Sequence, residues 1–253
     1  MKIAVAGKGG VGKTTISGTI ARALAREGHE VIAVDADVNP MLGISLGLGM
    51  DATESLAGLR QRPELGPDRS PDAEALLAHY GADAPDGVRV LVASRVDEPD
   101  SGCPGCGMTA DRLLCAIDST GRIVLGDMEA GIGVLARMAT GILDVVLVVT
   151  TPAPKAIEVA RRATRTAVAR DCRVIVVANR VRSDEDLEAI TAVLGDHDLV
   201  LIPDDAAIAD ADAEGLAPID VGADAPGVRA IIALSERLAP AVVAATSESR
   251  SRA

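Results

Sequence analysis

Aromatic side chains are nearly absent from this chain of 253 residues, which has no phenylalanine, no tryptophan and a single tyrosine, Tyr80. This absence excludes a core built around large rings, so the core must be packed from aliphatic side chains. The length is within the range of a single α/β domain and is sufficient to bury a large core.

The sequence also lacks a positive net charge and a long hydrophobic run. Its 25 lysines and arginines are outnumbered by 37 aspartates and glutamates, which gives a net charge of −12, so we expect no overall attraction to DNA or to anionic lipid. No apolar run approaches the length of a membrane span, and no signal peptide fits before a strand that begins at Lys2. We therefore expect a cytoplasmic protein without a nucleic-acid or membrane partner.

Cysteine is scarce, with four residues in the chain. In the cytoplasm these thiols are expected to be reduced, and a close pair is then more typical of a metal or redox site than of a structural disulfide. Cys103 and Cys106 form such a pair, with the pattern C-x-x-C. Cys115 and Cys172 are expected to be small core side chains.

A phosphate-binding loop is predicted almost at the N-terminus. The apolar run at 3–6 predicts a buried strand, and apolar residues recur at helical spacing over 15–25. The pattern G-x-x-x-x-G-K-[ST] lies between them, in the order of strand, glycine-rich loop and helix that is typical of a nucleotide site. Lys13 is expected to reach the β- and γ-phosphates, and Thr14 to bind Mg²⁺. The residues expected to bind the nucleotide here are Gly7, Lys8, Gly9, Gly10, Val11, Gly12, Lys13, Thr14 and Thr15.

An ordinary loop of this kind does not need Lys8, and a lone lysine is most often a solvated surface charge. The run Lys-Gly-Gly-Val-Gly-Lys-Thr nevertheless resembles the deviant Walker A motif of the MinD/ParA family, which contains the nitrogenase iron protein, septum-positioning and plasmid-partitioning ATPases, and metal-insertion ATPases. In that family the additional lysine reaches across a nucleotide-sandwich dimer to the phosphates bound by the other subunit. The resemblance implies an ATPase with catalytic Lys8 and Lys13 that forms a homodimer on binding ATP.

Aspartates after two further predicted strands add to the expected site, because ligands bind at the carboxyl ends of strands in an open α/β sheet. Asp37 resembles the switch I aspartate of the family, which orients the attacking water and contacts Mg²⁺ indirectly. Asp35 is expected to support it, and a plain loop or capping carboxylate is the alternative for this segment. Asp127 ends the apolar strand that starts at Arg122 and suits the Walker B role of holding the hydration shell of Mg²⁺.

The base of the nucleotide is expected at the end of the strand predicted at 174–178. A side-chain amide can pair with both the donor and the acceptor of an adenine edge. The family has Asn-Arg at this strand end, where it contacts the base, so the resemblance implies that Asn179 and Arg180 bind adenine. It also places Pro203 and Asp204, which follow the last predicted strand, beside the adenine.

The cysteine pair is the second chemical signal. Two thiolates supply two of the four ligands that a closed tetrahedral site requires, and the partner subunit of a homodimer would supply the other two. Such a site suits Zn²⁺, Ni²⁺ or an iron–sulfur cluster. A pair of free thiols in a Gly/Pro turn is the alternative.

The run Asp-Met-Glu-Ala-Gly-Ile at 127–132, downstream of this loop, resembles the CooC-type nickel-insertion ATPases of carbon monoxide dehydrogenase maturation. The CooC type is expected to carry C-x-C, whereas this chain has C-x-x-C. The nitrogenase iron protein would place a second cluster cysteine just after Asp127, where this chain has Ile-Gly-Val-Leu at 132–135.

The resemblance favours an ATP-dependent dimeric metallochaperone or maturation ATPase that inserts nickel into carbon monoxide dehydrogenase or a related metalloenzyme. One alternative is an iron–sulfur electron donor like the nitrogenase iron protein. Another is a MinD/ParA-like spatial organiser, which would need a basic amphipathic tail or a basic face. Four arginines on the helix predicted at 155–170 would suit an acidic partner or would form a solvated face; they are Arg161, Arg162, Arg165 and Arg170.

Alternating strands and helices predict one α/β domain over 1–245, a P-loop NTPase fold with a mostly parallel twisted sheet and helices on both faces. Residues 51–86 contain four prolines and are expected to be a variable insert, either a partner-binding lid or an exposed connector. The closing helix predicted at 227–245 is interrupted at Pro240, and 246–253 are expected to form a flexible tail.

Overall fold

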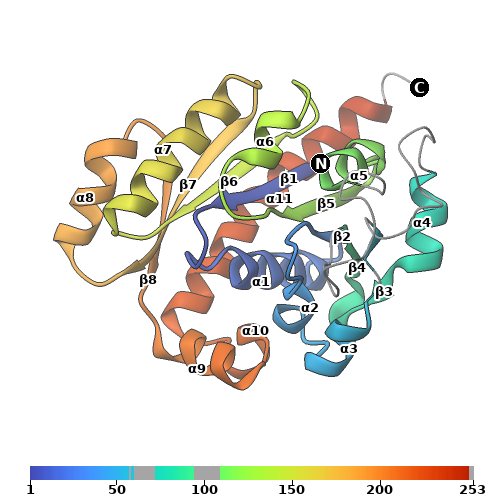
Figure 1. The fold of residues 1–253 in the computed structure, drawn as a ribbon, viewed down its shortest axis with the longest axis horizontal. Coiled ribbons are helices and arrows are strands. Elements are labelled where there is room, and N and C mark those ends of the chain that lie inside the picture. Colours follow the sequence, from blue (N-terminus) through green and yellow to red (C-terminus); the bar gives the residue numbers. More distant parts are fainter. Residues whose placement is uncertain (57, 60–71, 94–108, 251–253) are drawn as a thin grey trace, which may run out of the picture.

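One sheet of eight strands forms the centre of the molecule, in the order β3-β4-β2-β5-β1-β6-β7-β8 (Figure 1). The computed structural model describes residues 1–56, 58–59, 72–93 and 109–250, with side chains up to residue 238. All strand pairings in this sheet are parallel except that of β3 with β4, as the sequence predicts. The strands are β1 (Lys2–Gly7), β2 (Glu30–Asp35), β3 (Ala82–Asp83), β4 (Arg89–Val92), β5 (Arg122–Asp127), β6 (Val145–Thr150), β7 (Arg173–Val181) and β8 (Asp198–Pro203).

The central strand β1 shows why the sheet is covered on both faces. Its residues are all buried, and successive side chains point to opposite sides of the sheet. Ile3 and Val5 join one hydrophobic cluster, whereas Ala4 and Ala6 join the other. The largest fully buried side chains are isoleucines and leucines, so the core is aliphatic, as expected.

Helices contribute to these two clusters in two groups. One face is covered by α1 (Lys13–Arg26), α2 (Leu42–Ser45) and α11 (Pro226–Arg250). The other is covered by α4 (Ala73–Tyr80), α5 (Ala110–Ala116), α6 (Gly133–Arg137), α7 (Pro154–Val168) and α8 (Asp184–Leu194). Beside the first group lie α3 (Met50–Ser55), α9 (Ala206–Glu214) and α10 (Pro218–Val221), and the 3-10 turn η3 (Pro85–Gly87) precedes β4.

Helix α1 connects the N-terminal loop to the core. Ile16, Ile20 and Leu24 are buried at intervals of four residues, so they form one apolar stripe against the sheet. The helix ends at Arg26, and Gly28 follows with a positive φ of 90°, a conformation that favours glycine.

Two expectations from the sequence are wrong. The closing helix is not interrupted at Pro240, since α11 continues through it to Arg250; proline removes one helical hydrogen bond, and the alanine-rich residues that follow favour a helix. Cys115 is exposed, because Leu113, Leu114 and Ile117 are the residues of this segment that face the core. Among the described residues, no helix combines the length and hydropathy needed to cross a bilayer.

Candidate nucleotide-binding site

The loop between β1 and α1 has a conformation that only glycine adopts easily. Gly7 and Gly12 have φ values of 152° and 93°. A Cβ atom on Gly7 would lie 2.3 Å from the carbonyl oxygen of Val149, and one on Gly12 would lie 2.5 Å from Nδ2 of Asn179. The two glycines therefore permit a backbone path that a side chain would block.

The start of α1 suits an anion. Its N-cap, Gly12, provides no side-chain cap, so the N–H groups of the first turn remain available to a phosphate. The Lys13 side chain is 7% exposed, and its Nζ lies 3.4 Å from the carbonyl oxygen of Lys8, which folds it back over the loop. The Lys8 side chain is exposed.

Asp127 ends β5 directly beside the loop, because Val5 of β1 is its register partner. Its side chain is 1% exposed and accepts hydrogen bonds from the hydroxyl groups of Thr14 and Ser17, the latter at 3.1 Å. Hydroxyl and carboxylate oxygens are the ligands that Mg²⁺ prefers, so Thr14 and Asp127 fit the cation expected here.

A second buried carboxyl group lies beside the first, because Asp35 of β2 is in register with Asp127. Burial and, next, the charge of Asp127 raise the pKa of Asp35 to about 8. Burial also raises the pKa of Asp127 to about 6, although the Thr14 hydroxyl and the charge of Lys13 act to lower it. Two neighbouring carboxyl groups resist ionising together unless a cation compensates them, so the pair fits a divalent ion.

Asp35 also shapes the segment that follows β2. It accepts hydrogen bonds from the backbone N–H groups of Asp37 at 3.1 Å and Leu42 at 2.8 Å. Asp37 is half-buried and accepts a hydrogen bond from the N–H of Asn39. Asp37 and the phosphate loop line the same cavity, which has a volume of about 620 Å³. The other lining residues of this cavity include Gly9, Gly10, Lys13, Thr14, Met41 and Met50.

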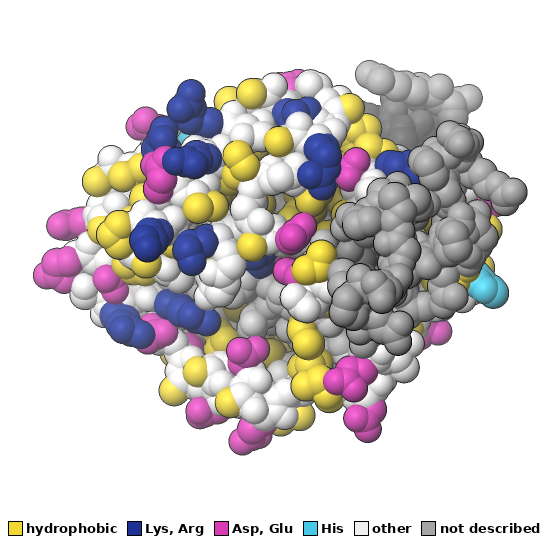
Figure 2. Space-filling view, viewed as in Figure 1, with side chains coloured by type: hydrophobic (Ala, Val, Ile, Leu, Met, Phe, Trp, Pro, Cys, Tyr) yellow, Lys and Arg dark blue, Asp and Glu magenta, His cyan; other side chains and the backbone are white. Residues whose placement is uncertain are grey.

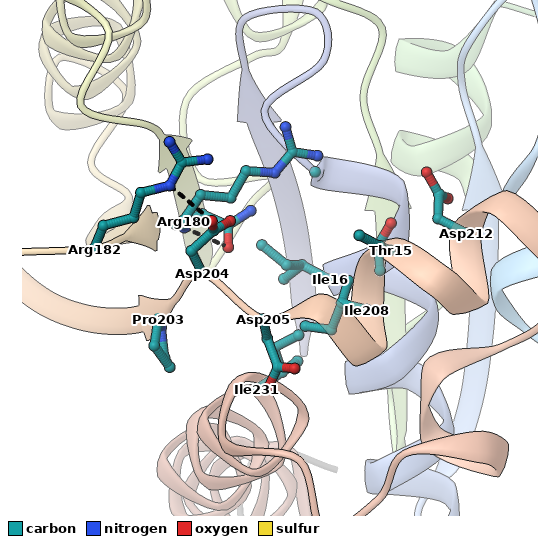
Figure 3. A pocket seen from close by; sticks show the side chains of 13 residues that line it. Thr15, Ile16, Arg180, Arg182, Pro203, Asp204, Asp205, Ile208, Asp212 and Ile231 are labelled. Atoms are coloured by element: carbon teal, nitrogen blue, oxygen red, sulfur yellow. Dashed lines mark hydrogen bonds and ion pairs between the residues drawn. The ribbon is translucent and has the colours of Figure 1, made fainter.

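A second cavity, of about 340 Å³, continues from Gly12 and Thr15 toward the ends of β7 and β8 (Figure 3). Asn179 lies here and is held in place, since its Nδ2 donates to the carbonyl of Val11 at 2.8 Å and its Oδ1 accepts from the N–H of Arg180 at 3.0 Å. One N–H and one lone pair of the amide remain for a base. Arg180, Pro203 and Asp204 line the same cavity, so the structure brings the expected base-binding residues together.

Several residues of the site were not identified from the sequence. Ser17 follows Thr14 by three residues, a spacing that places both on one side of a helix. This spacing could have indicated from the sequence that Ser17 lies near Asp127. Ile208 and Asp212 belong to α9 and line the cavity together with Ile231 of α11. Arg182 also reaches it and makes an ion pair of 2.7 Å with Asp204 (Figure 3).

The proposed cysteine ligands, Cys103 and Cys106, lie outside the described residues. Within the part that is described, no group of three or more His, Cys, Asp or Glu side chains is arranged to hold a metal ion. The first described residues after the cysteine loop, Thr109 and Ala110, line a cavity of about 460 Å³ together with Val38 and Glu129.

Comparison with known proteins gives a consistent result. The nucleotide-binding domain model of the CobQ/CobB/MinD/ParA family matches residues 2–219. The carbon monoxide dehydrogenase accessory protein CooC of Rhodospirillum rubrum is 32% identical, over 95% of this chain and 98% of its own. An uncharacterized ATP-binding protein of Methanocaldococcus jannaschii is 30% identical, over 77% of this chain and 80% of its own. The septum site-determining protein MinD of Pyrococcus horikoshii, solved with Mg-ADP, has a TM-score of 0.74 at 22% identity and covers 94% of this chain and 95% of its own.

Proposed function

The chain belongs to the CobQ/CobB/MinD/ParA family of nucleotide-binding domains and is an ATP-binding ATPase, and we propose that it matures a client metalloenzyme by delivering a metal ion. The observation that carries this proposal is the identity with CooC over nearly the full length of both chains. Because CooC is named as an accessory protein of carbon monoxide dehydrogenase, the proposed client is that enzyme or a related one, and the proposed cargo is Ni²⁺.

Hydrolysis is proposed to proceed by positioning and charge neutralisation. Lys13 and the N–H groups at the start of α1 would face the transferring phosphoryl group. Thr14 would bind Mg²⁺ and Asp127 would hold its hydration shell, and the ion would neutralise developing charge. Asp37, in the same cavity as Lys13, orients the attacking water. Lys8, which is exposed, reaches the phosphates of a second subunit.

The described residues support a connection between the nucleotide and the cysteine loop. Val38 follows Asp37 directly, and Glu129 follows Asp127 by two residues. Both line the cavity that also includes Thr109, which comes three residues after Cys106. A change in either segment can therefore act on Thr109, which follows the cysteine pair by three residues in the sequence, and we propose that closure of an ATP-bound dimer brings two such pairs together around the cargo.

The proposal is tested by light scattering coupled to size-exclusion chromatography, with metal analysis of each peak after anaerobic reconstitution. With a non-hydrolysable ATP analogue, the parent protein is expected to form a dimer that carries about one metal ion. Cys103→Ser with Cys106→Ser is expected to lose the metal, and Lys8→Ala is expected to remain monomeric while still binding nucleotide.

Two matched controls are available. Cys115→Ser removes an exposed thiol on α5, and Lys155→Ala removes an exposed lysine on α7; neither is expected to change the result. A parent protein that binds no Ni, Zn or Fe would refute metal delivery. A brown iron–sulfur chromophore would instead favour the electron donor.

A further inference from the structure

A pocket lined by arginines lies between α7 and the segment that contains α6. Its volume is about 530 Å³, and its lining includes no aspartate or glutamate. We call it the arginine pocket, and its lining residues are Ile132, Thr140, Arg162, Arg165, Thr166, Ala169 and Arg170. Figure 2 shows dark-blue side chains gathered over α7, whereas acidic side chains occupy the lower edge of the same view. Such a concentration of positive charge is unusual in a chain whose net charge is −12.

The positive charge of the pocket is only partly compensated. Arg162 shares Glu158 with Arg161, at 2.8 Å for each arginine. The Arg165 side chain has no ion pair or hydrogen bond with any other residue that the structure describes. Arg170 donates to backbone carbonyls, which carry no net charge.

Arg170 connects the pocket to the nucleotide site. Its guanidinium group donates to the carbonyls of Ala136 and Met138 at the end of α6. At the other end of that helix, Ile132 lines the pocket, and the N–H of the preceding residue, Gly131, donates to the carbonyl of Gly7 in the phosphate loop at 3.0 Å. A shift of this segment with the bound nucleotide would therefore change the shape of the pocket.

We propose that the arginine pocket docks an acidic segment of a partner protein, and that the bound nucleotide controls its affinity. Arg162 lies six residues before the end of α7 at Val168, or roughly 9 Å along the helix, and Arg170 lies two residues beyond that end. This length exceeds a single phosphate group and suits successive carboxylate side chains, which guanidinium groups bind with two hydrogen bonds each. The negative net charge of the chain disfavours an extended nucleic-acid backbone. The inference goes beyond the proposed function, because such docking requires neither the cysteine pair nor a metal.

The test measures the binding of a fluorescein-labelled oligoglutamate peptide by fluorescence anisotropy, with ADP or a non-hydrolysable ATP analogue present. Arg162→Glu with Arg165→Glu is expected to raise the Kd by about tenfold or more, because two attractive charges become repulsive. The neutral pair, Arg162→Gln with Arg165→Gln, is expected to give a smaller increase. Arg170 is left intact because it holds α6.

The matched control is Arg229→Glu, which reverses an exposed charge on α11, on the opposite face of the sheet; its Kd is expected to stay within about twofold of the parent value. The proposal is overturned if the parent protein does not bind the peptide, or if Arg229→Glu weakens binding as much as the pocket variants. Displacement of the peptide by duplex DNA or by phosphatidylserine vesicles, at lower concentration than by unlabelled peptide, would also overturn it. Equal Kd values with both nucleotides would overturn the nucleotide control.

Discussion

A cluster of charged groups lies near each end of helix α1, and the two clusters differ in how the charge of their buried members is balanced. Near its start, Asp35 and Asp127 lie side by side with raised pKa values. Near its end, Arg22 is 3% exposed and makes ion pairs with Asp86 and, at 2.8 Å, with Asp220. The first cluster has an excess of carboxyl groups, whereas the second places an arginine between two carboxylates.

This difference in charge balance indicates a ligand-binding role for the first cluster and a structural role for the second. Buried carboxylates without a compensating cation weaken a fold, so their presence near the phosphate loop is consistent with a site that is completed by a ligand. The second cluster needs no ligand, and the Nη1 atom of Arg22 also donates to the carbonyl of Leu46 at 2.9 Å. It joins α1, η3, α10 and the residue after α2, so we expect it to contribute to stability and not to chemistry.

The largest expected effect comes from Asp127→Asn in the first cluster. ATP hydrolysis is expected to fall by about a hundredfold to a thousandfold, because the mechanism proposed above needs the Asp127 carboxylate to hold the hydration shell of Mg²⁺. The free energy of unfolding of the nucleotide-free protein, in contrast, is not expected to fall. A carboxyl group whose pKa is raised in the folded state destabilises that state once the pH exceeds its ordinary value. The variant should therefore be at least as stable as the parent at about pH 8, above the raised pKa of Asp127.

Hydrolysis rates and urea unfolding of the nucleotide-free protein in EDTA measure both effects. Asp83→Asn is the control, because it changes an aspartate on the sheet edge whose side chain is 82% exposed. It removes an exposed ion pair with Arg89, so hydrolysis is expected to stay unchanged and stability to change by less than about 1 kcal/mol. A destabilised Asp127→Asn protein would show that this carboxylate supports the fold, and the contrast between the clusters would then fail.

The second prediction concerns Arg22→Ala, which is expected to lower the free energy of unfolding by about 2 kcal/mol. The substitution removes the contacts of Arg22 with two carboxylates and with the Leu46 carbonyl. Both carboxylates keep contact with water and with Arg26, so the loss should be smaller than for a fully buried pair.

Arg26→Ala is the matched control because Arg26 contacts the same two carboxylates from a position that is 42% exposed. It is expected to cost about 0.5 kcal/mol. Urea unfolding at neutral pH compares the two variants. Equal losses would mean that burial of Arg22 adds nothing to its ion pairs.

The two clusters also differ in how far the sequence predicts them. The phosphate loop, Asp37 and Asp127 follow from local order along the chain, because the ends of parallel strands meet at one edge of the sheet. The fold class follows from the same alternation of strands and helices. Arg22 gives no such signal, since an arginine on a helix is most often solvated and Asp220 is 198 residues away.

Other features that depend on tertiary contacts were likewise not predicted. Asp212 and Ile208 line the base cavity because α9 packs beside it, and no short pattern in the sequence specifies that approach. The exposure of Cys115 depends on which side of the short helix α5 faces the core. The arginines of α7 were identified, but their position against α6 required the fold.

The smallest expected effect is a pH dependence that separates the charge of the second cluster from its packing. Burial acts to raise the pKa of Asp86, but hydrogen bonds from Arg22 and Arg26 outweigh it and hold the pKa below its ordinary value. A carboxyl group of this kind stabilises the fold above its unfolded pKa, and that contribution is lost as the pH falls through the folded value. The difference in unfolding free energy between the parent and Arg22→Ala should therefore narrow by less than about 1 kcal/mol from about pH 5 to about pH 3. The pKa values of Asp118 and Asp198 are also lowered, but their contributions are common to both proteins and cancel. A difference that stayed constant over this range would assign the effect of Arg22 to packing alone.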